Sequence, residues 1–291
     1  MQKNCKTYLI KIISIALFTV KAHAIIGGID VADGSSLSNH VLSLVAKESG
    51  RYNWNGQGGM IYEYGPQTQC SAVALSKRVV LTAAHCWNYK SNVTHFLKVK
   101  DGQLKDIEIP IYSKKIHELY LLDFWGYNYN YDLALLQLSQ DLPDNIKFAN
   151  LPEYKDQIKF KYINAAGFGK TVGTYSSDVG TGFLRVTTLK VNHVERTVFK
   201  TDQHHGKGIC HGDSGGPAYA ISHNKTYLVG IVSIVSGKEK NENIHRNACN
   251  DYSIFVRVDN NLSWIKKNLK QLNSGERTSE TLLEKIKIHE D

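Results

Sequence analysis

Residues 212–217 read Gly-Asp-Ser-Gly-Gly-Pro, and this hexapeptide is the most informative stretch of the sequence for fold and chemistry. Small residues on both sides of Ser214 leave its hydroxyl accessible to a substrate. Gly212 and Gly215 also allow backbone N–H groups to turn toward an oxyanion that forms beside the serine. An alcohol is a weak nucleophile at neutral pH, so a reactive Ser214 needs a base, and the base needs an orienting partner.

Two earlier segments supply these groups. Residues 81–86 (LTAAHC) contain His85, and residues 131–136 (YDLALL) contain Asp132. A single His or Asp carries little information, but the order His, Asp, Ser, each in such a context, is much more specific. We therefore interpret Ser214 as a nucleophile, His85 as its base and Asp132 as the group that orients the base.

The TAAHC and GDSGGP motifs resemble those of the trypsin/chymotrypsin family of serine proteases, over about residues 25–272. The resemblance implies an all-β fold of two antiparallel six-stranded β-barrels, with the active site between them. It also implies that His85 takes the Ser214 proton and returns it to the leaving amine, while Asp132 holds the imidazole. The N–H groups of Gly212 and Ser214 would form the oxyanion hole.

The pattern of the remaining chain favours the same fold class. Short β-rich runs recur between turn signals, which is typical of an all-β sandwich or barrel. The clearest runs are residues 41–45, 79–81, 134–138, 184–186, 228–232 and 254–258. A C-terminal helix is expected after Asp259 or Asn260, either of which could cap it. One face of this helix would carry Leu262, Ile265, Leu269 and Leu272.

Residues 1–24 are expected to be an export signal. This segment has four lysines and no acid, an apolar stretch over 12–20 and an Ala-His-Ala cleavage pattern at 22–24. Its removal halves the formal net charge of +8, so charge is no argument for a nucleic-acid partner. We expect a secreted monomer that acts on proteins or peptides, with no cofactor, metal, nucleic acid or stable membrane insertion. It would be extracellular, or periplasmic if the host is a Gram-negative bacterium.

The resemblance also implies a mode of activation. In this family a new N-terminus, usually Ile-Val-Gly-Gly, folds inward, and its amine pairs with the Asp before the catalytic Ser. Residues 25–28 (IIGG) match, so Ile25 would pair with Asp213. Ala24 precedes Ile25, where many family zymogens have Arg or Lys. We therefore expect removal of the signal peptide itself to create the active N-terminus. Cleavage after Ala22 is the alternative.

Removal of residues 1–24 also removes Cys5, and the four remaining cysteines of an exported chain favour two disulfides. The resemblance implies the pairs Cys70–Cys86 and Cys210–Cys249. The second pair would lie beside the specificity pocket.

The family's pocket floor lies six residues before the catalytic Ser, at Gly208, where trypsin-like members have Asp. Val235 in place of a glycine would narrow the entrance and favour small or medium apolar P1 residues. The other expected lining residues are Ile209, Ser233 and Ser253. A register shift of two residues would bring Asp251 to the pocket and favour Arg or Lys, so that alternative stays open.

A non-catalytic binding module on the same fold, or an esterase with the same triad, would fit the motifs. Residues 51–64 and 120–131 are rich in aromatic residues, and the second segment could provide an aromatic wall for substrate. Residues 273–291 are expected to form a solvated acidic tail.

Overall fold

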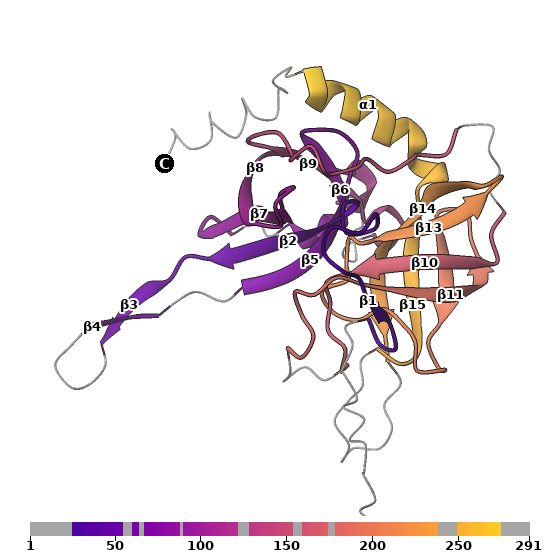
Figure 1. Cartoon of the computed structure of the whole chain (residues 1–291), viewed down its shortest axis with the longest axis horizontal. Coiled ribbons are helices and arrows are strands. Elements are labelled where there is room, and N and C mark those ends of the chain that lie inside the picture. Colours follow the sequence, from indigo (N-terminus) through magenta and orange to yellow (C-terminus); the bar gives the residue numbers. More distant parts are fainter. Residues whose placement is uncertain are drawn as a thin grey trace, which may run out of the picture.

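The computed structural model describes residues 25–54, 60–63, 67–87, 90–121, 128–153, 159–173, 178–237 and 249–274. For residues 51–54 and 60–63 the description covers the strand pairing alone. Two β-barrels follow one another along the chain, and a helix comes last (Figure 1). Within these ranges, no helix is long and apolar enough to cross a membrane.

Six antiparallel strands close the first barrel. In barrel order they are β2 (Val41–Glu48), β5 (Gln67–Ala74), β6 (Val79–Thr82), β9 (Ala134–Leu138), β8 (Asp106–Ile116) and β7 (Val93–Lys100). β6 is buried along its whole length and pairs with β9, with Leu81 opposite Leu135. This burial explains why residues 79–82 form a continuous apolar run that leads directly to the LTAAHC motif.

The second barrel also closes with six strands, because β11 pairs with both β10 and β12. The strands are β10 (Tyr162–Gly167), β11 (Arg185–Val194), β12 (Val198–Asp202), β13 (Pro217–Ser222), β14 (Lys225–Ser236) and β15 (Tyr252–Arg257). β1 (Ile29–Asp30) adds to the edge of β11. Phe199 and Phe255 pair across β12 and β15, are fully buried, and stack with ring centroids 4.9 Å apart.

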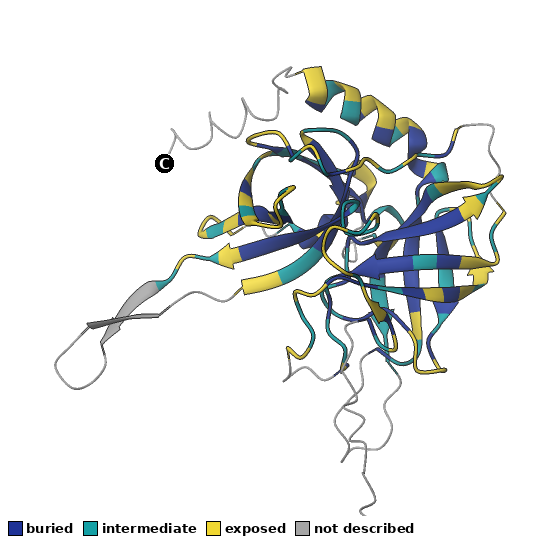
Figure 2. Cartoon of the chain, in the orientation of Figure 1, coloured by how far each residue is buried: buried dark blue, intermediate teal, exposed yellow. Residues whose placement is uncertain are grey.

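The two barrels share buried side chains where they meet. Leu228, Ile231 and Val256 of the second barrel belong to the same apolar cluster as Leu81 and Leu135 of the first. Figure 2 shows the strands of both barrels as largely buried, with exposed residues gathered at turns and on one side of the helix. The two six-stranded barrels confirm the expected fold class.

The C-terminal helix α1 (Leu262–Ser274) packs against the first barrel. Leu262, Ile265 and Leu272 are buried as expected, and Gln137 Nε2 of β9 donates to the Leu272 carbonyl at 2.7 Å. The expected cap is wrong, because Asp259 and Asn260 lie in a 3-10 turn, η4 (Asp259–Asn261), that runs directly into α1. The carboxylate of Asp259 instead pairs with Arg257.

The structure also describes parts of two segments singled out in the sequence, the tail 273–291 and the aromatic segment 51–64. α1 extends to Ser274, so the first two residues of the expected tail belong to its last turn; the remainder, 275–291, lies outside the described residues. The aromatic segment 51–64 contains β3 (Arg51–Trp54) and β4 (Met60–Glu63). These strands form a separate two-stranded sheet that extends from the ends of β2 and β5 (Figure 1).

Candidate active site

His85 lies in a single 3-10 turn, η1 (Ala84–Cys86), that begins where β6 ends. Thr82 at the end of β6 donates its hydroxyl to the Ser71 carbonyl on β5 at 2.8 Å. A disulfide between Cys70 and Cys86 joins the same two segments across 16 residues. The hydrogen bond and the disulfide together hold the backbone of His85 against the barrel wall.

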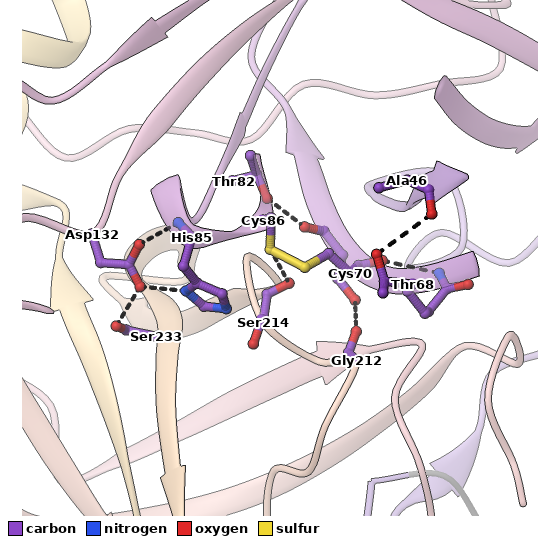
Figure 3. The surroundings of a disulfide bond; sticks show 12 residues. Ala46, Thr68, Cys70, Thr82, His85, Cys86, Asp132, Gly212, Ser214 and Ser233 are labelled. Carbon is purple, nitrogen blue, oxygen red and sulfur yellow. Dashed lines mark hydrogen bonds and ion pairs between the residues drawn. A yellow bond between two sulfur atoms is a disulfide. The ribbon is translucent and has the colours of Figure 1, made fainter. Parts of the chain in front are cut away.

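Asp132 lies between the 3-10 turn η3 (Tyr129–Tyr131) and β9. Its side chain is 3% exposed, yet its oxygens are well satisfied. Oδ1 accepts the His85 backbone N–H at 2.9 Å, Oδ2 lies 2.7 Å from His85 Nδ1, and Ser233 Oγ donates to Oδ2 at 2.6 Å (Figure 3). These bonds fix the orientation of the imidazole and leave its Nε2 free for chemistry.

His85 and Asp132 each stabilise the charged form of the other. Burial by itself would lower the pKa of His85, but the charge and hydrogen bond of Asp132 outweigh it, and the pKa is raised. Burial would likewise raise the pKa of Asp132, but His85 and the Ser233 hydroxyl lower it overall. Asp132 therefore stays ionised at neutral pH, and it stabilises a proton on His85.

Ser214 lies in the loop before β13, and this loop is held by both barrels. Ser71 N of the first barrel donates to the Ser214 carbonyl at 2.7 Å, and Gly215 N donates to Val232 of β14 at 2.8 Å. Figure 3 shows Ser214 beside the His85 imidazole and below the Cys70–Cys86 disulfide. Within the described part of the chain, no hydrogen bond joins the Ser214 hydroxyl to His85; such bonds often tighten only when substrate binds.

The backbone around Ser214 presents two unused donors. Gly212 has φ +95°, a conformation that favours glycine, and a Cβ there would lie 2.9 Å from the Gly169 Cα. Its carbonyl accepts a hydrogen bond from Ser71 Oγ at 3.1 Å. Among the described residues, neither Gly212 N–H nor Ser214 N–H donates to protein. These are the two groups that are expected, from the resemblance, to form an oxyanion hole.

Asp213 is completely buried. Its carboxylate accepts Gly169 N at 2.8 Å and Cys210 N at 2.9 Å. Burial raises the pKa of Asp213 to about 7, because these hydrogen bonds do not compensate for the lost hydration. No ion pair to Asp213 occurs within the described ranges, so its charge is poorly compensated.

The N-terminal segment lies against the same region. Ile25 is fully buried and packs with Ile209 and Phe255 in the second-barrel core. Ile26 forms a β-bridge with Gly208, whose N–H donates to the Ile26 carbonyl at 3.0 Å. Residues 25–28 therefore lie next to the expected pocket segment, as the activation hypothesis requires.

The side chain of Gln203 packs directly against Gly208, the expected floor of the pocket. A Cβ on Gly208 would lie 2.3 Å from the Gln203 side chain, which is itself buried. Gln203 Oε1 accepts Ile209 N at 2.6 Å, and Nε2 donates to the carbonyls of Ile209 and Cys249 at 3.1 and 2.9 Å. The Cys210–Cys249 disulfide closes the same region. This role of Gln203 was missed, because a single Gln in a polar loop carries no sequence signal.

The expected wall residues come together on β14 and β15, where Val235 pairs with Ser253. The Ser253 hydroxyl is buried and lies 2.7 Å from Thr201 Oγ1. Ser233, expected on this wall, directs its hydroxyl to Asp132 instead of the pocket. Asp251 lies beyond the Val235–Ser253 pair, with its carboxylate 3.0 Å from His204 Nε2.

Comparison with known proteins agrees with this architecture. The family model described as Trypsin matches residues 45–265, so the chain belongs to the trypsin family, whose fold and site define a class of serine proteases. It is also similar to the human (Homo sapiens) chymotrypsin-like elastase family member 1. The two sequences are 24% identical over 241 residues, which cover 75% of this chain and 88% of the relative.

Proposed function

We propose that this protein is a secreted serine endopeptidase that cleaves peptide bonds through an acyl-enzyme intermediate. The observation that carries the proposal is the buried Asp132 carboxylate, which accepts hydrogen bonds from His85 and Ser233 beside the Ser214 loop. Non-catalytic proteins on this fold usually lack the Ser, the His or a flanking Gly, and all of these residues are present here.

The geometry supports a definite order of steps. His85 Nε2 accepts the Ser214 proton as Oγ attacks the carbonyl carbon of the substrate. The developing oxyanion takes hydrogen bonds from the unused N–H groups of Gly212 and Ser214. His85 then protonates the leaving amine, the C–N bond breaks, and water hydrolyses the acyl-enzyme with His85 again as base.

For the P1 residue we propose a preference for small or medium apolar side chains. The floor at Gly208 is uncharged and backed by the Gln203 amide, and the Ser253 hydroxyl is already paired with Thr201. The Asp251 carboxylate is engaged by His204, which favours an apolar pocket over a basic-residue pocket. One methylene changes such a preference by only about 1–3 kcal/mol.

The proposed activation step is removal of residues 1–24. The new α-amino group of Ile25 would pair with Asp213 and compensate for its buried charge. The burial of Ile25 and the raised pKa of Asp213 support this assignment. N-terminal sequencing of the active exported enzyme tests it, and an N-terminus other than Ile25 would contradict it. Acetylation of Ile25 should remove activity while the barrels remain folded.

A fluorophosphonate reagent tests the proposed chemistry. It should label the wild-type enzyme and fail to label Ser214→Ala, which is matched in size and leaves the fold intact. If the wild-type protein is not labelled, the proposed serine protease activity is ruled out. Degradation of a protein substrate then separates a protease from an esterase with the same triad.

The proposed tail is tested by deletion. Removal of residues 275–291 should leave peptide hydrolysis unchanged, because the helix that packs on the first barrel ends at Ser274. A large loss of activity would show that the tail takes part in the site. Gel filtration of the same two proteins checks the proposed monomer.

A further inference from the structure

A cavity of about 870 Å³ lies between the two barrels, outside the triad. Its walls come from β2, β7 and β8 of the first barrel and from residues 30–34 and 181–184. Sites that bind ligands commonly have this size. Gln69 of β5 also lines the cavity, and its Cγ would lie 3.6 Å from a Cβ placed on Gly212. The cavity therefore reaches the edge of the proposed oxyanion hole.

The position of Gln69 shows which part of a substrate would enter. Figure 3 shows Ser233 and Gly212 on opposite sides of Ser214. Val235 of the P1 pocket follows Ser233 on β14, whereas Gln69 lies on the side of Gly212. A substrate whose P1 residue occupies the pocket therefore directs its residues after the scissile bond past Gln69 and into the cavity.

Two polar atoms on the cavity wall have no hydrogen-bond partner in the described part of the chain. They are Asn145 Oδ1 and Thr181 Oγ1, and both atoms are buried. The Asn145 side chain is held in place, because its Nδ2 donates to the Lys100 carbonyl at 3.1 Å. Buried polar atoms are nearly always satisfied by protein, water or ligand. A peptide backbone carries a donor and an acceptor at almost every residue and could satisfy both atoms.

The rim of the cavity exposes apolar side chains. Leu104 is 47% exposed and has φ +61°, a conformation that a bulky residue rarely adopts. Asp101 holds this turn, since its Oδ1 accepts Gln103 N at 2.8 Å and Lys105 N at 2.9 Å. Phe183, which is 67% exposed, lines the same cavity. Backbone strain that keeps an apolar residue in solvent is typical of a binding position.

Acidic groups outnumber basic groups on the cavity wall. The lining contains four carboxylates, from Asp30, Asp33, Asp106 and Glu108, and two ammonium groups, from Lys98 and Lys100. Asp30 pairs with Arg185, and Lys98 lies 4.0 Å from Glu108. Lys100 is shared between Asp33 at 3.5 Å and Asp106 at 2.9 Å, so four carboxylates face three cations and one negative charge is in excess. The resulting negative potential favours a ligand that carries a cationic side chain.

We propose that this cavity is a remote substrate site that binds polypeptide after the scissile bond and prefers an apolar residue together with a basic one. The proposal rests on the proposed protease function and extends it to substrate selection. Contacts far from the reacting atoms can contribute to kcat/KM, so long substrates gain an advantage over short ones.

Two substrates with the same residues before the scissile bond test the proposal. The short one ends in a fluorogenic amide at P1. The long one is an internally quenched peptide with about six residues after the bond, including Leu and Arg, since an extended chain advances roughly 3.3 Å per residue. Leu104→Gly removes the apolar contact and should lower kcat/KM on the long peptide roughly 10-fold or more. Thr181→Val removes the buried hydroxyl without a change of shape and should act in the same direction.

Neither variant should change kcat/KM on the short substrate. His223→Gly is the matched control for Leu104→Gly, because His223 also has a positive φ (+48°) but lies in the turn between β13 and β14. Replacement of the Arg in the long peptide by Glu should lower cleavage by the wild type. An unchanged ratio of long to short cleavage in both folded variants would overturn the proposal. A wild-type enzyme that cleaves neither substrate would instead overturn the protease function beneath it.

Discussion

The two barrels hold their parts of the site in different ways. In the first barrel, His85 and Asp132 lie at the ends of buried strands, and every hydrogen bond that fixes them is already present. In the second barrel, the pocket segment depends on Gln203, on a disulfide and on Asp213, whose buried charge has no ion pair among the described residues. The difference fits the proposals made above, in which His85 is oriented before substrate binds and the pocket is completed only when the N-terminal segment supplies a cation for Asp213.

The largest expected effect on activity comes from the loss of the Asp132–His85 interaction in the first barrel. Asp132→Asn should lower kcat about 10⁴-fold, as the equivalent change does in proteases with this triad, because the imidazole loses its orienting acceptor. The wild-type kcat/KM should rise with pH through a pKa above 6.5, since Asp132 raises the pKa of His85. Pre-steady-state kinetics and pH–rate profiles measure both. A folded Asp132→Asn enzyme with near-normal activity would contradict the role of Asp132.

The second prediction concerns Asp213 and pH. In the uncleaved precursor the pKa of Asp213 is about 7, against 3.8 for an ordinary Asp, so the folded state binds more protons than the unfolded state. The free energy of unfolding should therefore fall as pH rises from about 4 to about 7 and level off above. Denaturant titrations of the precursor measure this slope.

Two further proteins, a precursor with Asp213→Asn and the mature enzyme, test whether this pH dependence of the free energy of unfolding comes from Asp213. The slope should disappear in a precursor with Asp213→Asn, which cannot ionise. It should also disappear in the mature enzyme, where under the proposed activation the Ile25 amine would compensate for the charge. An equal slope in precursor and mature enzyme would argue against the Ile25–Asp213 pair.

A smaller effect is expected at Gln203. Gln203→Leu leaves the backbone groups of Ile209 and Cys249 without partners, which costs about 1–3 kcal/mol and loosens the pocket floor. KM should rise with little change in the rate of acylation of a small ester. Gln137→Leu is the control, because Gln137 also bonds to backbone, at Leu272, but in the first barrel. Equal effects of both variants on KM would show a general loss of stability.

The smallest effect is expected at Ser233. Its hydroxyl stabilises the Asp132 anion most when His85 is neutral, so Ser233→Ala should disfavour neutral His85 and raise the His85 pKa. The acidic limb of the pH–rate profile should then move to higher pH, with a loss of only about 1 kcal/mol in transition-state stabilisation. A shift to lower pH would contradict this account of the hydrogen bond.

Much of the fold and the triad was predictable because the signals are local. β-rich runs with buried faces and three short motifs place His85, Asp132 and Ser214 on definite strands and loops. Gln203 and the Ser233–Asp132 bond were not predictable, since each depends on segments far apart in sequence. The helix cap at Asp259 was predicted wrongly because Arg257, two residues earlier, competes for its carboxylate.

Arg185 has a further consequence for the molecule. Its side chain is 6% exposed, pairs with Asp30 of β1, and donates to the carbonyls of Gly180 and Phe183 on the cavity rim. β1 begins four residues after Ile25, so the same short strand joins the rim to the N-terminal segment. By thermodynamic linkage, a ligand that binds the cavity more tightly when β1 is docked must also favour insertion of the N-terminus. Under both proposals, substrate selection and maturation would therefore be coupled through the docking of β1.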